Sequence, residues 1–142
     1  MPKRKAKSPQ QLRKEALATI QKMVRLKAAD DNGMVECVSC GVVKHWTEMQ
    51  GGHYLPKGSS SYWALEVENV HPQCPGCNNF GMKHGDAAQR YTLYMVDTYG
   101  RDFVEDMHKS KRLPMKLYAA AYRDMIEAWK LIIKENLERL GE

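Results

Sequence analysis

A chain of 142 residues has room for one domain, with space for an appended helical arm. Its formal charge of +5 suits a polyanionic partner. It has no apolar run of the roughly 18–20 residues that a membrane helix needs, and no apolar segment of a secretory signal follows its basic start. We therefore expect no membrane association and a cytoplasmic location, where cysteines stay reduced.

The N-terminal region, residues 1–33, is predicted to be a basic arm that leads into a helix. Residues 1–29 hold nine Lys and Arg residues and one acid, so the positive excess of the chain lies here. Ser8 is a suitable N-cap before a proline, and Asn32-Gly33 is expected to end the helix. The basic face either contacts the phosphates of a nucleic acid or is simply solvated.

The central region, residues 34–100, contains all four cysteines of the chain. They form two Cys-x-x-Cys pairs, Cys37 with Cys40 and Cys74 with Cys77. Two such pairs can supply the four thiolates of a tetrahedral Zn²⁺ site. The alternative, two disulfides, is rare in a reducing compartment. We predict structural zinc, which would contribute folding free energy that a small apolar core lacks.

The C-terminal part of the chain is predicted to be helical. Asp86 is a candidate N-cap of a helix that ends at Gly100, and a shorter helix follows from about Asp102. Residues 101–142 form a helical extension in which Pro114 opens a long final helix, about 40 Å at ~1.5 Å per residue. This helix packs either against the first helix or against a second copy of the chain. Its apolar face, more suited to a core or a dimer contact than to base stacking, holds Tyr118, Tyr122, Met125, Trp129 and Ile132.

Four short motifs follow one another in the central region. They are Cys37-x-x-Cys40, Gly52-His53-Tyr54-Leu55-Pro56, Glu68-Asn69-Val70-His71 and Cys74-x-x-Cys77-Asn78. Their order and spacing resemble those of the HNH endonucleases, also called ββα-metal or His-Me finger endonucleases. More narrowly, the segment from Asn69 to Asn79, followed by Lys83, Gly85 and Tyr91, resembles the NinG/Rap recombination proteins of lambdoid phages.

The resemblance implies a mostly helical α+β fold. A small zinc-stapled ββα-metal (HNH) core would be flanked by the N-terminal basic helix and by the C-terminal helices. In that core, a β-hairpin would carry His53, a loop would follow, and a helix would begin after Cys77.

The resemblance also implies roles for three residues. His53 would be the general base, because a neutral imidazole near pH 7 can take a proton from water. Asn69 would brace the loop and orient His53, and Asn78 would offer its amide oxygen to a catalytic Mg²⁺ or Mn²⁺. The alternatives are a core or second zinc-site histidine for His53, an ordinary turn residue for Asn69 and a helix cap for Asn78.

The sequence departs from the commonest HNH pattern at the residue before the base. Many HNH enzymes have Asp or His there as a metal ligand, whereas this chain has Gly52. Candidate substitute ligands are His71, His84, Glu68 and Asp86, although His84 is also typical of an exposed loop and Asp86 of a helix cap. Candidate phosphate contacts, each of which could equally be a surface charge, are Lys57, Lys83 and Arg90.

The function implied by the resemblance is metal-dependent nicking of branched DNA, such as Holliday junctions and D-loops, in the host cytoplasm if the protein is phage-encoded. Symmetric junction cleavage would need a homodimer, with the final helix as the expected interface. The alternatives are a sequence-tolerant HNH nicking or restriction-type nuclease, a non-catalytic zinc module that binds DNA, and a zinc-stapled adaptor for other proteins.

Overall fold

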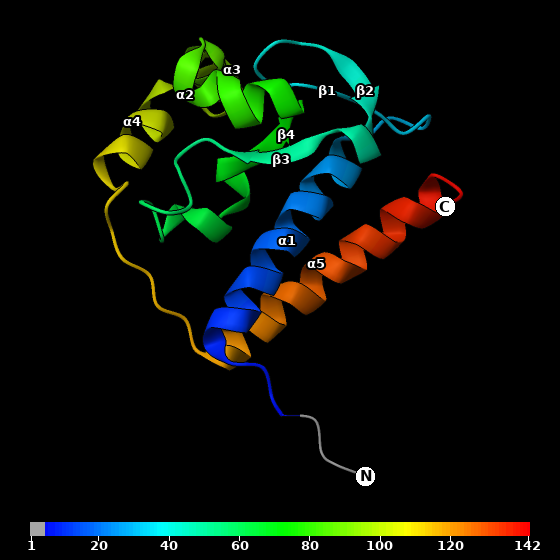
Figure 1. The fold of residues 1–142 in the computed structure, drawn as a ribbon, viewed down its shortest axis with the longest axis vertical. Coiled ribbons are helices and arrows are strands. Elements are labelled where there is room, and N and C mark those ends of the chain that lie inside the picture. Colours follow the sequence, from blue (N-terminus) through cyan, green and yellow to red (C-terminus); the bar gives the residue numbers. More distant parts are fainter. Residues whose placement is uncertain (1–4) are drawn as a thin grey trace.

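The computed structural model describes residues 5–142, so Lys3 and Arg4 of the predicted basic arm lie outside the described residues. The described chain is mostly helical α+β, with two small antiparallel sheets (Figure 1). This confirms the predicted fold class at the level of α+β. The helices and strands are α1 (Pro9–Ala28), β1 (Met34–Glu36), β2 (Val43–His45), β3 (Gln50–His53), β4 (Val70–Gln73), α2 (Met82–His84), α3 (Ala87–Tyr99), α4 (Arg101–Lys109) and α5 (Ala119–Arg139).

Helix α1 begins at the predicted cap. The Ser8 hydroxyl accepts a hydrogen bond from the Gln11 backbone N–H at 3.2 Å, and the Gln11 side chain accepts one from the Ser8 N–H at 2.9 Å. The prediction that the helix ends at Asn32-Gly33 was wrong, because α1 ends at Ala28. The Asp30 carboxylate accepts hydrogen bonds from the N–H groups of Asn32 and Met34, both at 2.9 Å, and so favours a turn over a further helical turn.

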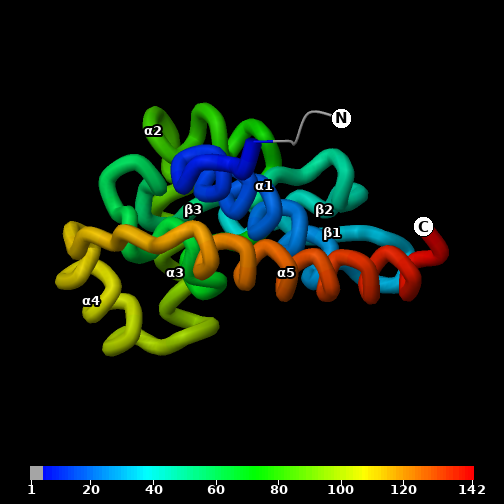
Figure 2. Tube along the Cα trace, turned by 90° about the horizontal axis from the view of Figure 1, so that it is seen from below, coloured from blue at the N-terminus to red at the C-terminus, as the bar shows by residue number. Residues whose placement is uncertain are grey.

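Helices α1 and α5 lie side by side (Figures 1 and 2). Tyr122 and Ile126 of α5 are buried in one core cluster with Leu12, Ile20 and other apolar residues of α1. Of the two predicted arrangements, the structure shows the final helix packed on the first helix. It begins at Ala119 rather than at Pro114, so its 21 residues extend about 31 Å instead of about 40 Å.

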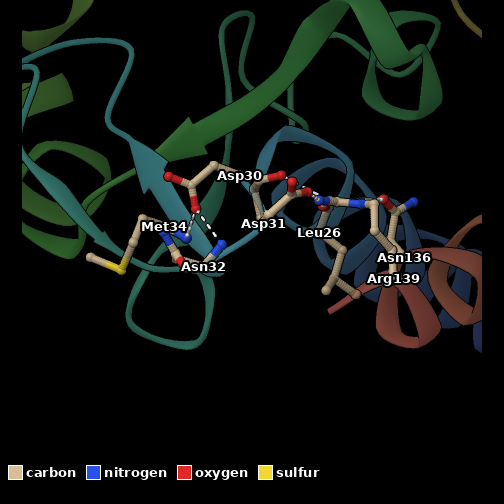
Figure 3. A network of polar contacts seen from close by, with 8 residues as sticks. Leu26, Asp30, Asp31, Asn32, Met34, Asn136 and Arg139 are labelled. Carbon is tan, nitrogen blue, oxygen red and sulfur yellow. Dashed lines mark hydrogen bonds and ion pairs between the residues drawn. The ribbon is translucent and has the colours of Figure 1, made fainter. Parts of the chain in front are cut away.

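The end of α5 is fixed to the turn that follows α1 (Figure 3). The Arg139 guanidinium donates hydrogen bonds to the Ala29 carbonyl at 2.8 Å and to the Asp31 carboxylate at 3.0 Å. A guanidinium that satisfies carbonyl groups at a helix end favours a fixed position for both segments. The predicted N-terminal and C-terminal regions therefore pack together.

The sheet formed by β3 and β4 lies against α1. This contact positions His53, the last residue of β3. The two strands are antiparallel, with Gly52 opposite His71 and His53 opposite Val70. A Cβ atom at Gly51 would lie 2.6 Å from the Cα atom of Gln21, so the strand can approach α1 this closely only with glycine there.

Helices α3 and α4 form the remaining layer. Their bounds agree closely with the sequence prediction, and Gly100 between them has a φ of 89°, which favours glycine. Their buried residues pack on the segment that follows β3, in a cluster of Tyr54, Leu55, Tyr91, Met95, Val104 and Met107. In residues 5–142, no helix is long and apolar enough to span a membrane.

Candidate metal centre and catalytic groove

The four cysteines come together as predicted. Their sulfur atoms all lie within 4.8 Å of one another, and Cys40 Sγ is 3.7 Å from Cys74 Sγ. A tetrahedral Zn²⁺ site with Zn–S bonds of ~2.3 Å has S···S distances of about 3.8 Å. All four thiols are free, so the described structure contains no disulfide between them. The cluster therefore fits the predicted zinc ion, and it could hold one.

Hydrogen bonds join the cysteine cluster to the neighbouring elements. The Val38 N–H, in the first Cys-x-x-Cys pair, donates to the Pro72 carbonyl of β4 at 3.0 Å. The Ser39 hydroxyl donates to the Ala87 carbonyl of α3 and accepts from Gln73 of β4, both at 2.9 Å. A metal ion bound at this cluster would therefore stabilise the strand that pairs with β3.

His53 lies at the end of β3 and holds a defined tautomer. Its Nε2 atom is 2.8 Å from the Ala64 carbonyl oxygen. A carbonyl oxygen can only accept, so Nε2 carries the proton and Nδ1 of the neutral ring has the free lone pair. Burial lowers the pKa of His53, the hydrogen bond to Ala64 opposes this shift, and the charges of Lys57 and Arg13 lower the pKa further. The ring is therefore neutral near pH 7 and can accept a proton at Nδ1.

A groove of about 750 Å³ opens beside His53. It brings together four of the predicted site residues, namely His53, Asn78, Lys57 and Lys83. The other residues of the wall come from α1, from β3 and the loop after it, from α2, from α3, and from α4 and the segment after it. Within the described chain, the cysteine cluster contains no histidine, so His53 lies outside the metal centre.

Asn69 fixes the segment that follows His53. It is fully buried, and its amide oxygen accepts from the Leu55 N–H at 2.8 Å while its amide nitrogen donates to the Leu55 carbonyl at 3.0 Å. The Asn69 carbonyl also accepts from the Tyr54 N–H at 2.9 Å. Asn69 therefore determines the path of the chain at the edge of the groove.

Asn78 belongs to a short π-helical segment, Gly76–Gly81, that begins within the second cysteine pair and contains Cys77. Its Nδ2 atom donates to Gln50 Oε1 at 2.7 Å. Among the described residues, its Oδ1 atom has no hydrogen-bond partner. This bond to β3 orients the amide of Asn78, which lines the groove. An amide oxygen is a hard donor of the kind that Mg²⁺ prefers.

The structure does not bring His71 to His53. His71 pairs with Gly52, so it points to the opposite face of the sheet from His53. Its two ring nitrogens lie 2.9 Å from the Tyr91 hydroxyl and 2.8 Å from the Tyr99 hydroxyl. Burial lowers the pKa of His71 to about 4. In this arrangement His71 is a core residue with both nitrogens occupied, not a cation ligand of the groove.

The other predicted ligands and one predicted phosphate contact also lie outside the groove. His84 is exposed and contacts Phe80, with ring centroids 5.0 Å apart. Asp86 stands at the N-cap position of α3, but its carboxylate makes no capping bond and instead forms an ion pair with Arg90 at 2.9 Å. No Asp or Glu in the described chain lines the groove, so the substitute carboxylate ligand expected there is not assembled.

The absence of a side chain at Gly52 has a packing cause. A Cβ atom at Gly52 would overlap the Oε1 atom of Gln73 and would lie 2.6 Å from its Cδ atom. Gln73 is fully buried, and its Oε1 has no hydrogen-bond partner in the described structure. Gln73 therefore occupies the place where the Asp or His of the commoner pattern would begin.

Sequence reasoning missed three basic residues of the groove wall. His108 reaches the groove from α4, and Lys111 and Arg112 reach it from the segment that follows α4. His108 Nε2 lies 2.7 Å from the Tyr54 hydroxyl, which lies 2.7 Å from the Thr92 hydroxyl. No local pattern in the sequence marks these residues, because only the packing of α4 on the segment after β3 brings them here.

These observations define a mostly helical α+β protein with a four-cysteine cluster that could bind a metal. A family model described as the bacteriophage lambda NinG protein matches residues 1–139, so the chain belongs to the NinG family. This match confirms the narrower of the two resemblances. Comparison with curated proteins and with solved structures found no match.

Proposed function

We propose that this protein is a metal-dependent DNA endonuclease of phage recombination type, with His53 as the general base and zinc as a structural ion. The observation that supports the proposal is the state of His53. His53 lines a groove with cationic walls, its Nε2 is bound to the Ala64 carbonyl, which leaves the lone pair of the neutral ring on Nδ1, and burial lowers its pKa. The order of the motifs, which resembles that of HNH endonucleases, points to the same chemistry.

In the proposed reaction, His53 Nδ1 takes a proton from a water molecule in the groove. The water oxygen then bonds to the phosphorus atom, and one P–O ester bond of the DNA backbone breaks. The leaving oxygen receives a proton from solvent. The Ala64 carbonyl holds the ring in the tautomer that this step needs and stabilises the imidazolium that forms.

Mg²⁺ or Mn²⁺, when bound, would neutralise charge on the phosphate and on the leaving oxygen. The residue that fits this ion is Asn78, whose free Oδ1 is oriented by its hydrogen bond to Gln50. Because Mg²⁺ keeps several water and phosphate ligands in many sites, one protein oxygen is compatible with binding during the reaction. We therefore expect the protein to bind Mg²⁺ or Mn²⁺ only weakly when no DNA is present.

Branched DNA is the proposed substrate class, and the support for it is membership of the NinG family together with the resemblance to NinG/Rap recombination proteins. A groove lined by lysines and an arginine contacts phosphates, and phosphate contacts position DNA without reading its bases. A homodimer would place two such grooves on one junction.

The test is a nicking assay with Mg²⁺ on plasmid DNA and on four-way junctions. His53→Ala should lower the nicking rate by a factor of about 10² to 10⁴ while bound zinc stays unchanged. His84→Ala is the matched control, because His84 is an exposed histidine outside the groove.

Nicking by His53→Ala at the wild-type rate would refute the assignment of the base. A protein that binds DNA but never nicks it would instead be a zinc DNA-binding module, and one without DNA affinity would be an adaptor. Equal cutting of junctions with unrelated arm sequences would exclude a sequence-specific restriction-type nuclease.

A further inference from the structure

The groove has a cationic wall that comes from the segment after α4. Lys111 and Arg112 are exposed, and both line the groove together with Lys57, Lys83 and His53. Both belong to the connection between α4 and α5, residues 110–118, which Figure 1 draws in yellow to orange. Residues distant in the sequence therefore present cationic groups to the same space as the proposed base.

In the part of the chain that the structure describes, no acidic side chain pairs with these cations. No carboxylate of the described chain lines the groove, and none of the four Lys and Arg side chains in its wall belongs to an ion pair among residues 5–142. Other arginines nearby are neutralised, since Arg90 pairs with Asp86 and Arg101 with Glu105, both at 2.9 Å. Positively charged side chains that gather in a groove without acidic partners favour a polyanionic ligand.

The segment that carries Lys111 and Arg112 is fixed on both sides to the loop that follows His53. The Trp63 indole N–H donates to the Ser110 hydroxyl at 3.0 Å, and the Met115 N–H donates to the Ser61 hydroxyl at 3.1 Å. The same loop contains Ala64, whose carbonyl binds His53. The two cations are therefore held in a defined position relative to the proposed base.

We propose that Lys111 and Arg112 bind the phosphate backbone of the DNA strand that lies in the groove. This inference rests on the proposed function, because it names the side chains that position that substrate. Both residues are positioning residues: they act on affinity and on the placement of the strand, and they contact phosphates rather than bases.

The test uses the full-length zinc-loaded protein and a fluorescent four-way DNA junction in a buffer without Mg²⁺, Mn²⁺ or a chelator, so that the structural zinc is kept while the proposed nicking lacks its metal. Lys111→Ala/Arg112→Ala should weaken binding by a factor of about 30 at 0.15 M salt and reduce the salt slope of log K by about 2, since each lost phosphate contact contributes roughly 0.9 to that slope. The control Arg123→Ala/Lys134→Ala removes the same charge from α5, outside the groove, and should have a much smaller effect.

An unchanged affinity and salt slope, or a loss equal to that of the control, would overturn the inference. So would a wild-type protein that does not bind the junction. Because Lys111 and Arg112 are exposed, the variant should keep its zinc and its melting temperature, and Lys111→Glu/Arg112→Glu should weaken binding more strongly.

The kinetic readout separates this inference from the proposed function. With Mg²⁺, the double alanine variant should show a raised KM and a nearly unchanged kcat, unlike His53→Ala. Wild-type protein that binds through Lys111 and Arg112 without nicking would refute the proposed nuclease and support the inference. A protein that nicks DNA but binds it equally well without these two side chains would support the proposed nuclease and refute the inference.

Discussion

Gly52→Ala is expected to destabilise the protein through a single contact. The added Cβ atom would overlap Gln73 Oε1 and lie 2.6 Å from Cδ and 2.9 Å from Cγ, whereas carbon atoms normally approach to ~3.5–4.0 Å. Overpacking of this kind costs about 1–3 kcal/mol. Moving the Gln73 amide would also break its 2.9 Å bond to Ser39, which contributes about 1 kcal/mol. We expect a total loss of about 2–4 kcal/mol.

The assay is urea unfolding followed by tryptophan fluorescence, with zinc present at a fixed concentration. Gly58→Ala is the matched control, because no atom lies within 4 Å of a Cβ atom built at Gly58, and its stability should change little or rise slightly. Gln73→Ala removes the overlapping atoms, so the double variant Gly52→Ala/Gln73→Ala should lose less than the sum of the two single losses. A Gly52→Ala variant within about 0.5 kcal/mol of wild type, or strict additivity, would refute the reasoning.

Three further predictions concern the metal centre and two histidines. Cys40→Ser removes an exposed ligand and should lower bound zinc below one ion per chain and reduce the melting temperature, as measured by elemental analysis and calorimetry; retention of full zinc would contradict the site. The nicking rate should rise with pH on the acid side of its pH profile, with an apparent pKa below ~6.5, because the base must be neutral and burial lowers the pKa of His53. An apparent pKa at or above ~7 for this rise would count against His53 as the base. Burial lowers the pKa of His71 to about 4. The neutral ring therefore contributes its full stability above about pH 6.5, and this contribution is lost as pH falls towards 4, because the unfolded chain binds the proton first. Urea unfolding at fixed zinc should show this loss, of about 3 kcal/mol, and His71→Gln should show less of it.

Several features follow from neighbouring residues alone, and these could be predicted from the sequence. Ser8 and Gln11 cap α1 because a capping box involves positions three apart, and α3 ends at Gly100, whose positive φ favours glycine. The cysteine cluster was predictable because the Cys-x-x-Cys spacing already fits a tetrahedral ion. His53 and Asn78, which both line the groove, were predicted as site residues from the order of the motifs that surround them, and their catalytic roles stay a prediction.

The composition of the groove was decided by tertiary structure. Lys111 and Arg112 join it because α4 packs on the segment after β3, and His71 leaves it because strand register turns its ring to the other face. The absence of a side chain at position 52 also has a tertiary cause, because Gln73 of the paired strand β4 fills the space that such a side chain would need. The sequence alone determines caps, turns and metal ligands, which depend on residues a few positions apart. Which side chains converge on one groove depends on the pairing of distant segments, and only packing decides that.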